Sequence, residues 1–252
     1  MSYYNLLWGL LLLAVPCYML YAYDRLALPK AALAVARMIV QLSVMGGCLW
    51  ALYRFDTVPL CLLWLAVLVV ASSFLLVSRS GIRSSVLFLP ACVAMFVSVL
   101  AVSLFVIYAV LHPVASLSAR WFVPVTGVLL AHTLMTNIHA IRTYYESLRQ
   151  DHQPYLTLLG NGASRLVALA PYFTRALRSM MVPAFTSLSA MGLFVMPMLL
   201  SGLLLGGMGA IDSIAIFAVL VVACIATSLL SLALTLLLGD RRSFNRQGQP
   251  QY

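Results

Sequence analysis

The feature that most constrains this sequence is a series of long apolar stretches, which recur along nearly its whole length. Each holds about 20 predominantly apolar residues, the length at which an α-helix crosses the hydrocarbon core of a bilayer. The stretches cover residues 6–23, 33–53, 58–77, 86–111, 121–141, 181–205 and 213–238. They are too long and continuous for the strands of a membrane barrel. We therefore expect an all-α, polytopic membrane protein with about seven transmembrane helices.

Composition points to the same solvent. Of the 252 residues, 63% are hydrophobic and only 8% are charged, whereas about a quarter of a soluble domain is charged. The first stretch lacks a basic leader, so we expect a retained helix rather than a cleaved signal peptide. Residues 1–240 are expected to form one transmembrane domain. Residues 241–252, rich in Gln, Asn and Arg, are expected to form a disordered tail.

The positions of the basic residues predict the orientation. Thirteen of the 15 lysines and arginines fall in predicted loops or ends on one side: Arg25, Lys30, Arg37, Arg79, Arg83, Arg142, Arg149, Arg165, Arg175, Arg178, Arg241, Arg242 and Arg246. Cytoplasmic loops of membrane proteins carry this excess, so we expect the N-terminus outside and the C-terminus inside. The net charge of +9 then reflects topology. The lipid bilayer is a sufficient partner for it, and no nucleic acid is implied.

Missing residue types exclude several classes of function. The one lysine, Lys30, has no glycine-rich loop near it, so the chain cannot build a phosphate-binding P-loop of its own. The six acidic residues all lie near predicted helix ends or in loops, whereas ion-coupled pumps place ionisable groups near the bilayer centre. We expect no enzyme, no cofactor bound by this chain, and a partner that supplies energy for any uphill transport.

A basic segment with two glycines, residues 155–183, interrupts the apolar pattern. It predicts a short helix, a turn at Gly160 and Gly162, and a longer amphipathic helix on the cytoplasmic surface. The predicted apolar stripe of the longer helix is Leu166, Leu169, Phe173 and Leu177, at helical spacing. Pro183 is expected to begin the next membrane helix, where its missing N–H costs little. The segment is either an interfacial connector anchored to lipid or a docking element for a soluble partner.

An ordered set of motifs resembles the FetB-type permease family, the membrane half of an iron-exporting ABC transporter. The similarity covers about residues 26–238. The matching residues are Arg37, Gln41, Leu42 and Gly46, then Pro124 and Gly127, then Gly162, Ala163, Ser164, Arg178, Pro183, Gly192, Pro197, Ser201, Gly202, Gly206 and Gly207. His132 stands where that family has Asn, and Thr157 where it has an acidic residue.

The resemblance implies a homodimer in the bacterial inner membrane with separate ATPase subunits, which bind ATP and Mg²⁺. It also implies that the ATPase contacts the segment formed by Leu158, Leu159, Gly160, Gly162, Ala163 and Ser164. A metal cation such as iron, moved outward, is the implied substrate.

Three residues of the fifth stretch are candidate metal ligands. His132, Met135 and His139 lie at i, i+3 and i+7, which places them on one stripe of a helix. Imidazole nitrogen and thioether sulfur bind soft or borderline metals. The alternative is that the histidines form hydrogen bonds across helix contacts and Met135 fills space in the packing.

Other polar and small residues are candidates for gating or for packing. Arg37 and Gln41 share a helix face one turn apart, and Gln41 is expected to find a hydrogen-bond partner on a neighbouring helix. Pro197 is expected to kink the sixth span between Gly192 and Gly202, directly after the segment that contains Arg178.

The sequence therefore favours the permease subunit of an ABC transporter. A facilitator or channel that needs no ATP remains an alternative, as does a membrane scaffold or sensor. An ATPase that copurifies with the chain would distinguish the first class from the other two.

Overall fold

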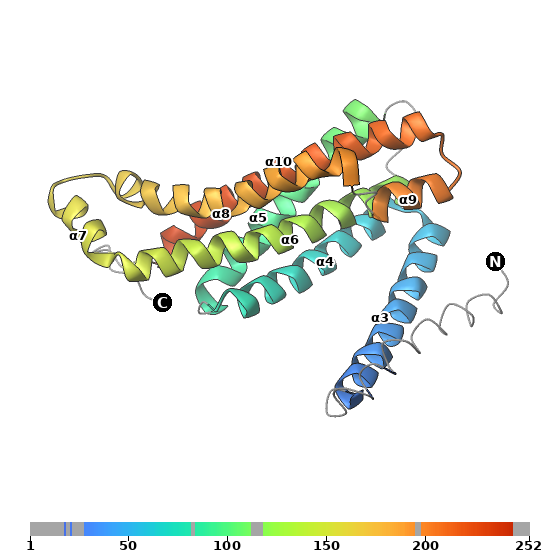
Figure 1. Cartoon of the computed structure of the whole chain (residues 1–252), viewed down its shortest axis with the longest axis horizontal. Coiled ribbons are helices and arrows are strands. Elements are labelled where there is room, and N and C mark those ends of the chain that lie inside the picture. The colour runs from blue at the N-terminus through green and yellow to red at the C-terminus, as the bar shows by residue number, and fades with distance from the viewer. Residues whose placement is uncertain are drawn as a thin grey trace. The chain divides into compact units, whose positions relative to one another are not determined.

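The structure is a computed structural model that describes residues 18, 21, 28–81, 84–111, 118–194 and 198–243. The regular elements within these ranges are helices, with no strand among them. In chain order they are α3 (Leu28–Phe55), α4 (Val58–Ser80), α5 (Ser84–Phe105) with a short π-helical continuation η2 (Val106–Val110), α6 (Ala119–Gln150), α7 (His152–Gly160), α8 (Arg165–Phe194), α9 (Met198–Leu205) and α10 (Ala210–Ser243) (Figure 1).

The chain divides into two compact units, Met1–Phe55 and Asp56–Tyr252. In the first unit, α3 carries Arg37 and Gln41, and both side chains are exposed. In the second unit, α10 packs along α5 and α6, while α6 also contacts α4 and α8.

The core of the second unit combines large aromatic side chains with small residues. Tyr144, Tyr145 and Phe122 of α6 are almost fully buried, and Ala91 and Ala94 of α5 are fully buried. Small residues let helix backbones approach closely, which is how helices associate in a membrane. The helices of this unit therefore form a close-packed bundle rather than a loose set of spans.

Among the residues that the structure describes, five helices are long and apolar enough to cross a membrane: Ala31–Phe55, Val58–Ser80, Leu87–Val110, Ala119–Gln150 and Ala210–Asp240. They coincide with five of the seven predicted stretches. The first predicted stretch, 6–23, lies outside the described residues except for positions 18 and 21. The structure thus confirms the all-helical expectation for the described ranges, with five candidate spans, and the count of seven stays a prediction.

The region of the predicted sixth span differs from expectation. Pro183 does not begin a helix there: α8 runs without interruption from Arg165 to Phe194 through Pro171 and Pro183. The predicted span 181–205 is accordingly divided between the second half of α8 and α9. Pro197 lies outside the described residues. A proline inside a helix removes one backbone hydrogen bond, but membrane helices tolerate it because neighbouring groups satisfy the freed carbonyl.

One end of the second unit gathers the predicted basic loops. The ends of α4, α6 and α10 and the starts of α5 and α8 lie there, and α7 is at the extreme of that end (Figure 1). We call it the basic end, because it holds Arg79, Arg142, Arg149, Arg165 and Arg175. Its assignment to the cytoplasm stays a prediction.

Candidate functional site

Helix α6, a candidate membrane span, is longer than the hydrocarbon core of a bilayer is thick. Its 32 residues extend about 48 Å at 1.5 Å per residue, against a hydrocarbon core of about 30 Å. The apolar residues 121–141 fill that thickness, and the charges begin with Arg142, Glu146 and Arg149. With α6 as a membrane span, its last turns project beyond the hydrocarbon into the headgroups and water.

The short helix α7 caps this projection. Together, residues 142–180 form a hairpin of two long helices with α7 at its tip, and we call these residues the hairpin (Figure 1). Tyr155 anchors α7, since its side chain is fully buried, and burial raises the pKa of its phenol. Leu156 and Thr157 are exposed, and Leu158 and Leu159 are partly buried. The tip thus presents Leu156, and in part Leu158 and Leu159, at its surface.

A glycine turn connects α7 to α8. The N–H of Gly162 donates to the carbonyl of Leu159 at 3.0 Å, and the N–H of Ala163 donates to that of Leu158 at 3.0 Å. This bond pair is the Schellman motif that ends many helices, and it needs a left-handed residue at the position of Gly162. Gly162 has φ +82°, which only glycine adopts without steric cost. The predicted helix–turn–helix order is confirmed.

The first half of α8 packs against α6 rather than lying apart on a membrane surface. Leu166 of the predicted stripe is 70% exposed, and of the four predicted residues only Leu169 is buried. The buried face is formed by Ala168, Leu169, Tyr172, Ala176 and Met180. Two alanines on this face permit a close approach of the two helices. The spacing of the large apolar residues did not predict this face, because alanines form part of it.

Two aspartates fix the hairpin at its sides. Where α6 meets α7, the backbone carbonyl of Asp151 accepts a hydrogen bond from the Tyr172 hydroxyl at 2.6 Å. The Asp151 carboxylate forms an ion pair with Arg175, whose guanidinium lies 5.8 Å from the centre of the Tyr172 ring. These contacts join the two arms of the hairpin to each other.

The second aspartate, Asp240, joins the hairpin to α10. Its Oδ2 accepts a hydrogen bond from the Tyr144 hydroxyl at 2.9 Å, and its backbone carbonyl accepts one from Arg165 at the start of α8. Beside it, α10 comes so close to α6 that a Cβ on Gly239 would lie 3.4 Å from the Tyr145 hydroxyl oxygen. Sequence reasoning missed this cluster, because its members are 75 and 96 residues apart.

The residues predicted to contact an ATPase all lie at the tip. Leu158, Leu159 and Gly160 are the last residues of α7, whereas Gly162, Ala163 and Ser164 form the turn that follows. The structure brings them together in one continuous surface, and it adds the exposed Leu156 and Thr157 of α7.

The predicted metal stripe is distributed differently. The Nδ1 of His132 lies 3.1 Å from the Ser228 hydroxyl of α10, while Met135 and His139 are exposed. A neighbouring buried residue, Asn137, donates its amide to the Ser231 hydroxyl at 3.0 Å. Within the described part of the chain, no three His, Cys, Asp or Glu side chains gather into a metal-binding group. His132 thus forms a hydrogen bond across a helix contact, as the alternative expectation held. Its role as a metal ligand, with Met135 and His139, stays a prediction.

The predicted gating residues are spread over several elements. Arg37 and Gln41 are exposed on α3, Arg178 is exposed on α8, and Gly202 lies exposed in α9. Gly192 lies in the last turn of α8.

Apolar helices of membrane-crossing length, joined to a charged hairpin at one end, define a multi-pass membrane protein. The model of the uncharacterised protein family UPF0014 matches residues 3–244, and the chain belongs to this family. It is 27% identical over 175 residues to the UPF0014 membrane protein slr1647 of Synechocystis sp., an alignment that covers 69% of this chain and 67% of that protein. No solved structure matches the chain.

Proposed function

We propose that this chain is the membrane-spanning permease subunit of an ABC transporter, and that a separate ATPase subunit docks on residues 152–164. The observation that carries the proposal is the hairpin: α6, a candidate membrane span, and α8 meet at a short helix on which Leu156 is exposed and Leu158 and Leu159 are partly buried. Exposed apolar side chains outside the bilayer are typical of a protein–protein contact. They coincide with the segment that contacts the ATPase in FetB-type permeases.

The arms of the hairpin are suited to carry a displacement from the tip into the bilayer. Both arms continue away from the tip as single helices, α6 toward Ala119 and α8 toward Phe194, and α6 is one of the candidate membrane spans. The contacts at Asp151 hold the arms together, and those at Asp240 connect them to α10. A force on α7 therefore acts on several helices of the bundle at once.

The energy for transport comes from the partner in this proposal. The chain's one lysine, Lys30, has no glycine-rich loop beside it, so the P-loop belongs to the ATPase subunit. Two copies of this chain would form the pathway, since the FetB-type resemblance implies a homodimer. A metal cation such as iron, moved out of the cell, is the proposed substrate, with His132, Met135 and His139 as candidate ligands along α6.

Copurification with matched variants tests the docking surface. Thr157 on α7 and Thr174 on α8 are both exposed, and each donates its hydroxyl to the carbonyl four residues earlier, at 3.0 and 2.9 Å. Thr157→Arg places a large charge at the tip and should weaken binding of a coexpressed ATPase at least about tenfold, equivalent to ~1.4 kcal/mol. Thr174→Arg should leave binding unchanged.

Two results would contradict the proposal in different ways. Normal ATPase binding by the Thr157→Arg variant would show that α7 is not the docking element. A wild-type chain that binds no ATPase and transports metal in proteoliposomes without ATP would instead identify a facilitator.

A further inference from the structure

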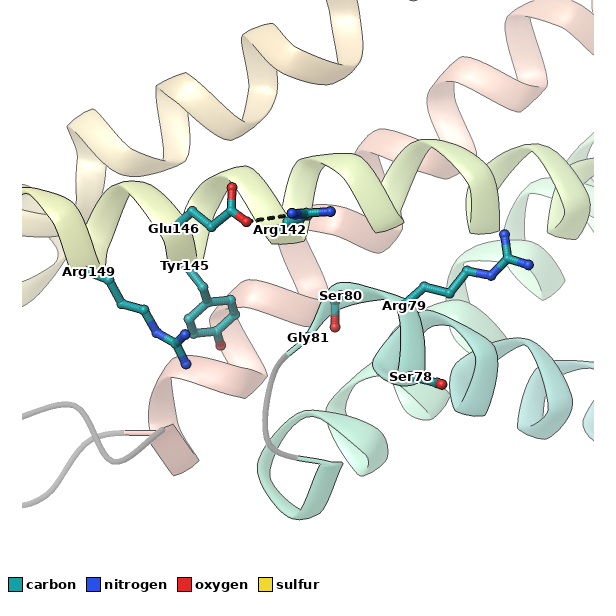
Figure 2. A pocket seen from close by; sticks show the side chains of 8 residues that line it. All are labelled: Ser78, Arg79, Ser80, Gly81, Arg142, Tyr145, Glu146 and Arg149. Atoms are coloured by element: carbon teal, nitrogen blue, oxygen red, sulfur yellow. Dashed lines mark hydrogen bonds and ion pairs between the residues drawn. The ribbon is translucent and has the colours of Figure 1, made fainter.

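A cavity of about 220 Å³ lies at the basic end, between the end of α4 and the projecting part of α6 (Figure 2). It is separate from the hairpin tip. Its lining residues are Ser78, Arg79, Ser80, Gly81, Arg142, Tyr145, Glu146 and Arg149. Three arginines and one glutamate give the cavity an excess of positive charge.

With α4 and α6 as membrane spans, the cavity lies at the depth of the lipid headgroups. The 23 residues of α4 extend about 35 Å, slightly more than a hydrocarbon core of about 30 Å, and the lining residues Ser78 to Gly81 are at its end. On the other wall, Arg142 is the first charged residue after the apolar stretch 121–141. Both walls therefore reach the membrane surface at the cavity.

The charged side chains that line the cavity come from two helices, α4 and α6. Figure 2 shows Arg79 and Arg149 on opposite sides, with Arg142 and Glu146 between them. The Arg142 Nε lies 2.7 Å from the Glu146 Oε1, and both side chains of this pair are more than half exposed, at 59% and 52%. Such an exposed pair is weak, so Arg142 can exchange Glu146 for another anion. Arg79 also offsets the partial negative charge of the last carbonyls of α4.

We propose that this cavity binds a phosphate group, and that the phosphate belongs to an acidic phospholipid. Guanidinium groups bind phosphate oxygens with paired hydrogen bonds, and the exposed Ser78 hydroxyl adds a further donor. Basic pockets between transmembrane helices are a recurring form of headgroup site. The same chemistry would accept inorganic phosphate, so the experiment separates the two sources.

Native mass spectrometry of the full chain tests the site. The protein in detergent is titrated with phosphatidylglycerol, phosphatidylcholine or inorganic phosphate, and the bound fraction is measured. We expect preference for phosphatidylglycerol, and a loss of about fivefold in affinity for each arginine removed. Arg79→Gln combined with Arg149→Gln should weaken binding roughly 30-fold. Arg178→Gln is the matched control, because Arg178 is exposed on α8 and does not line the cavity.

One further variant should bind lipid more tightly, a result that misfolding would not produce. Glu146→Gln removes the acid and releases Arg142, so it should tighten phosphatidylglycerol binding about fivefold. Equal binding by the cavity variants and the Arg178 variant would overturn the proposal, as would equal binding of the two lipids without binding of phosphate. Saturable binding of inorganic phosphate that follows the same variants, without lipid preference, would keep the phosphate site and overturn the lipid source.

Discussion

Replacing Gly162 by alanine tests whether the left-handed turn determines how the tip is held. Its φ of +82° costs an L-residue about 1–2 kcal/mol. Because no atom lies within 4 Å of the added Cβ, the cost is the backbone conformation alone. It should appear as local opening of the turn, where the N–H groups of Asn161, Gly162 and Ala163 each donate a 3.0 Å hydrogen bond.

Hydrogen exchange measured by mass spectrometry gives the magnitude. A loss of about 1–2 kcal/mol in opening free energy speeds exchange roughly 5–30-fold, and the peptide that spans 157–164 should show it. Gly207 offers a matched control at the other end of the bundle. It has φ +87° and equally open space, and the same motif: Gly207 N–H donates to Leu204 and Met208 N–H to Leu203.

The two substitutions should therefore cause similar backbone strain and have different effects on function. Gly207→Ala should speed exchange near residue 207 by a similar factor, while only Gly162→Ala should lower ATPase binding or the coupling of ATP hydrolysis to transport. Exchange in 157–164 within twofold of the wild type would refute the steric argument. Equal loss of coupling in both variants would refute the special role of the tip.

Three further contacts give predictions that thermal unfolding in detergent can measure. Asp56→Ala should cost about 1 kcal/mol, because the Asp56 Oδ1 accepts the first N–H of α6 at 2.6 Å; Asp56→Asn should retain most of the stability. Ser231→Ala should cost about 0.6–1.7 kcal/mol, since it leaves the buried amide of Asn137 without its 3.0 Å partner. Burial raises the pKa of the Tyr172 phenol above its ordinary value. The resulting contribution to the free energy of unfolding is therefore complete below pH ~10 and is lost as the pH rises through the pKa of the folded state. Tyr172→Phe should abolish this part of the loss of stability at alkaline pH.

The spans were predictable because they depend on a single physical property, the favourable transfer of apolar residues into lipid. Each span shows this property as a continuous apolar stretch of the sequence. Five predicted stretches coincide with five helices long enough to cross a membrane. The glycine turn was also predictable, because its signal, two glycines within three residues, lies in one short stretch of sequence. The sequence Gly160-Asn161-Gly162 does not show which glycine takes the left-handed conformation, and the backbone bonds of Gly162 and Ala163 decide it.

The contacts that fix the hairpin could not be predicted in the same way. Asp240 meets Tyr144 and Arg165 only after α6, α8 and α10 have packed, and nothing local in the sequence marks that pairing. The expectation for Pro183 was wrong because a rule for helix starts was applied to a proline that a membrane helix accommodates in its interior.

The place of Pro183 within α8 has a mechanical consequence. Prolines are preferred points of bending. Pro183 divides the 30-residue helix into an arm of about 27 Å toward Arg165 and an arm of about 17 Å toward Phe194. A bend of about 5° at Pro183 moves Arg165 through roughly 2.4 Å relative to the arm that ends at Phe194. Such a hinge lets the arm at the tip swing while the other arm stays in place, and a swing away from α10 breaks the bond between Arg165 and Asp240.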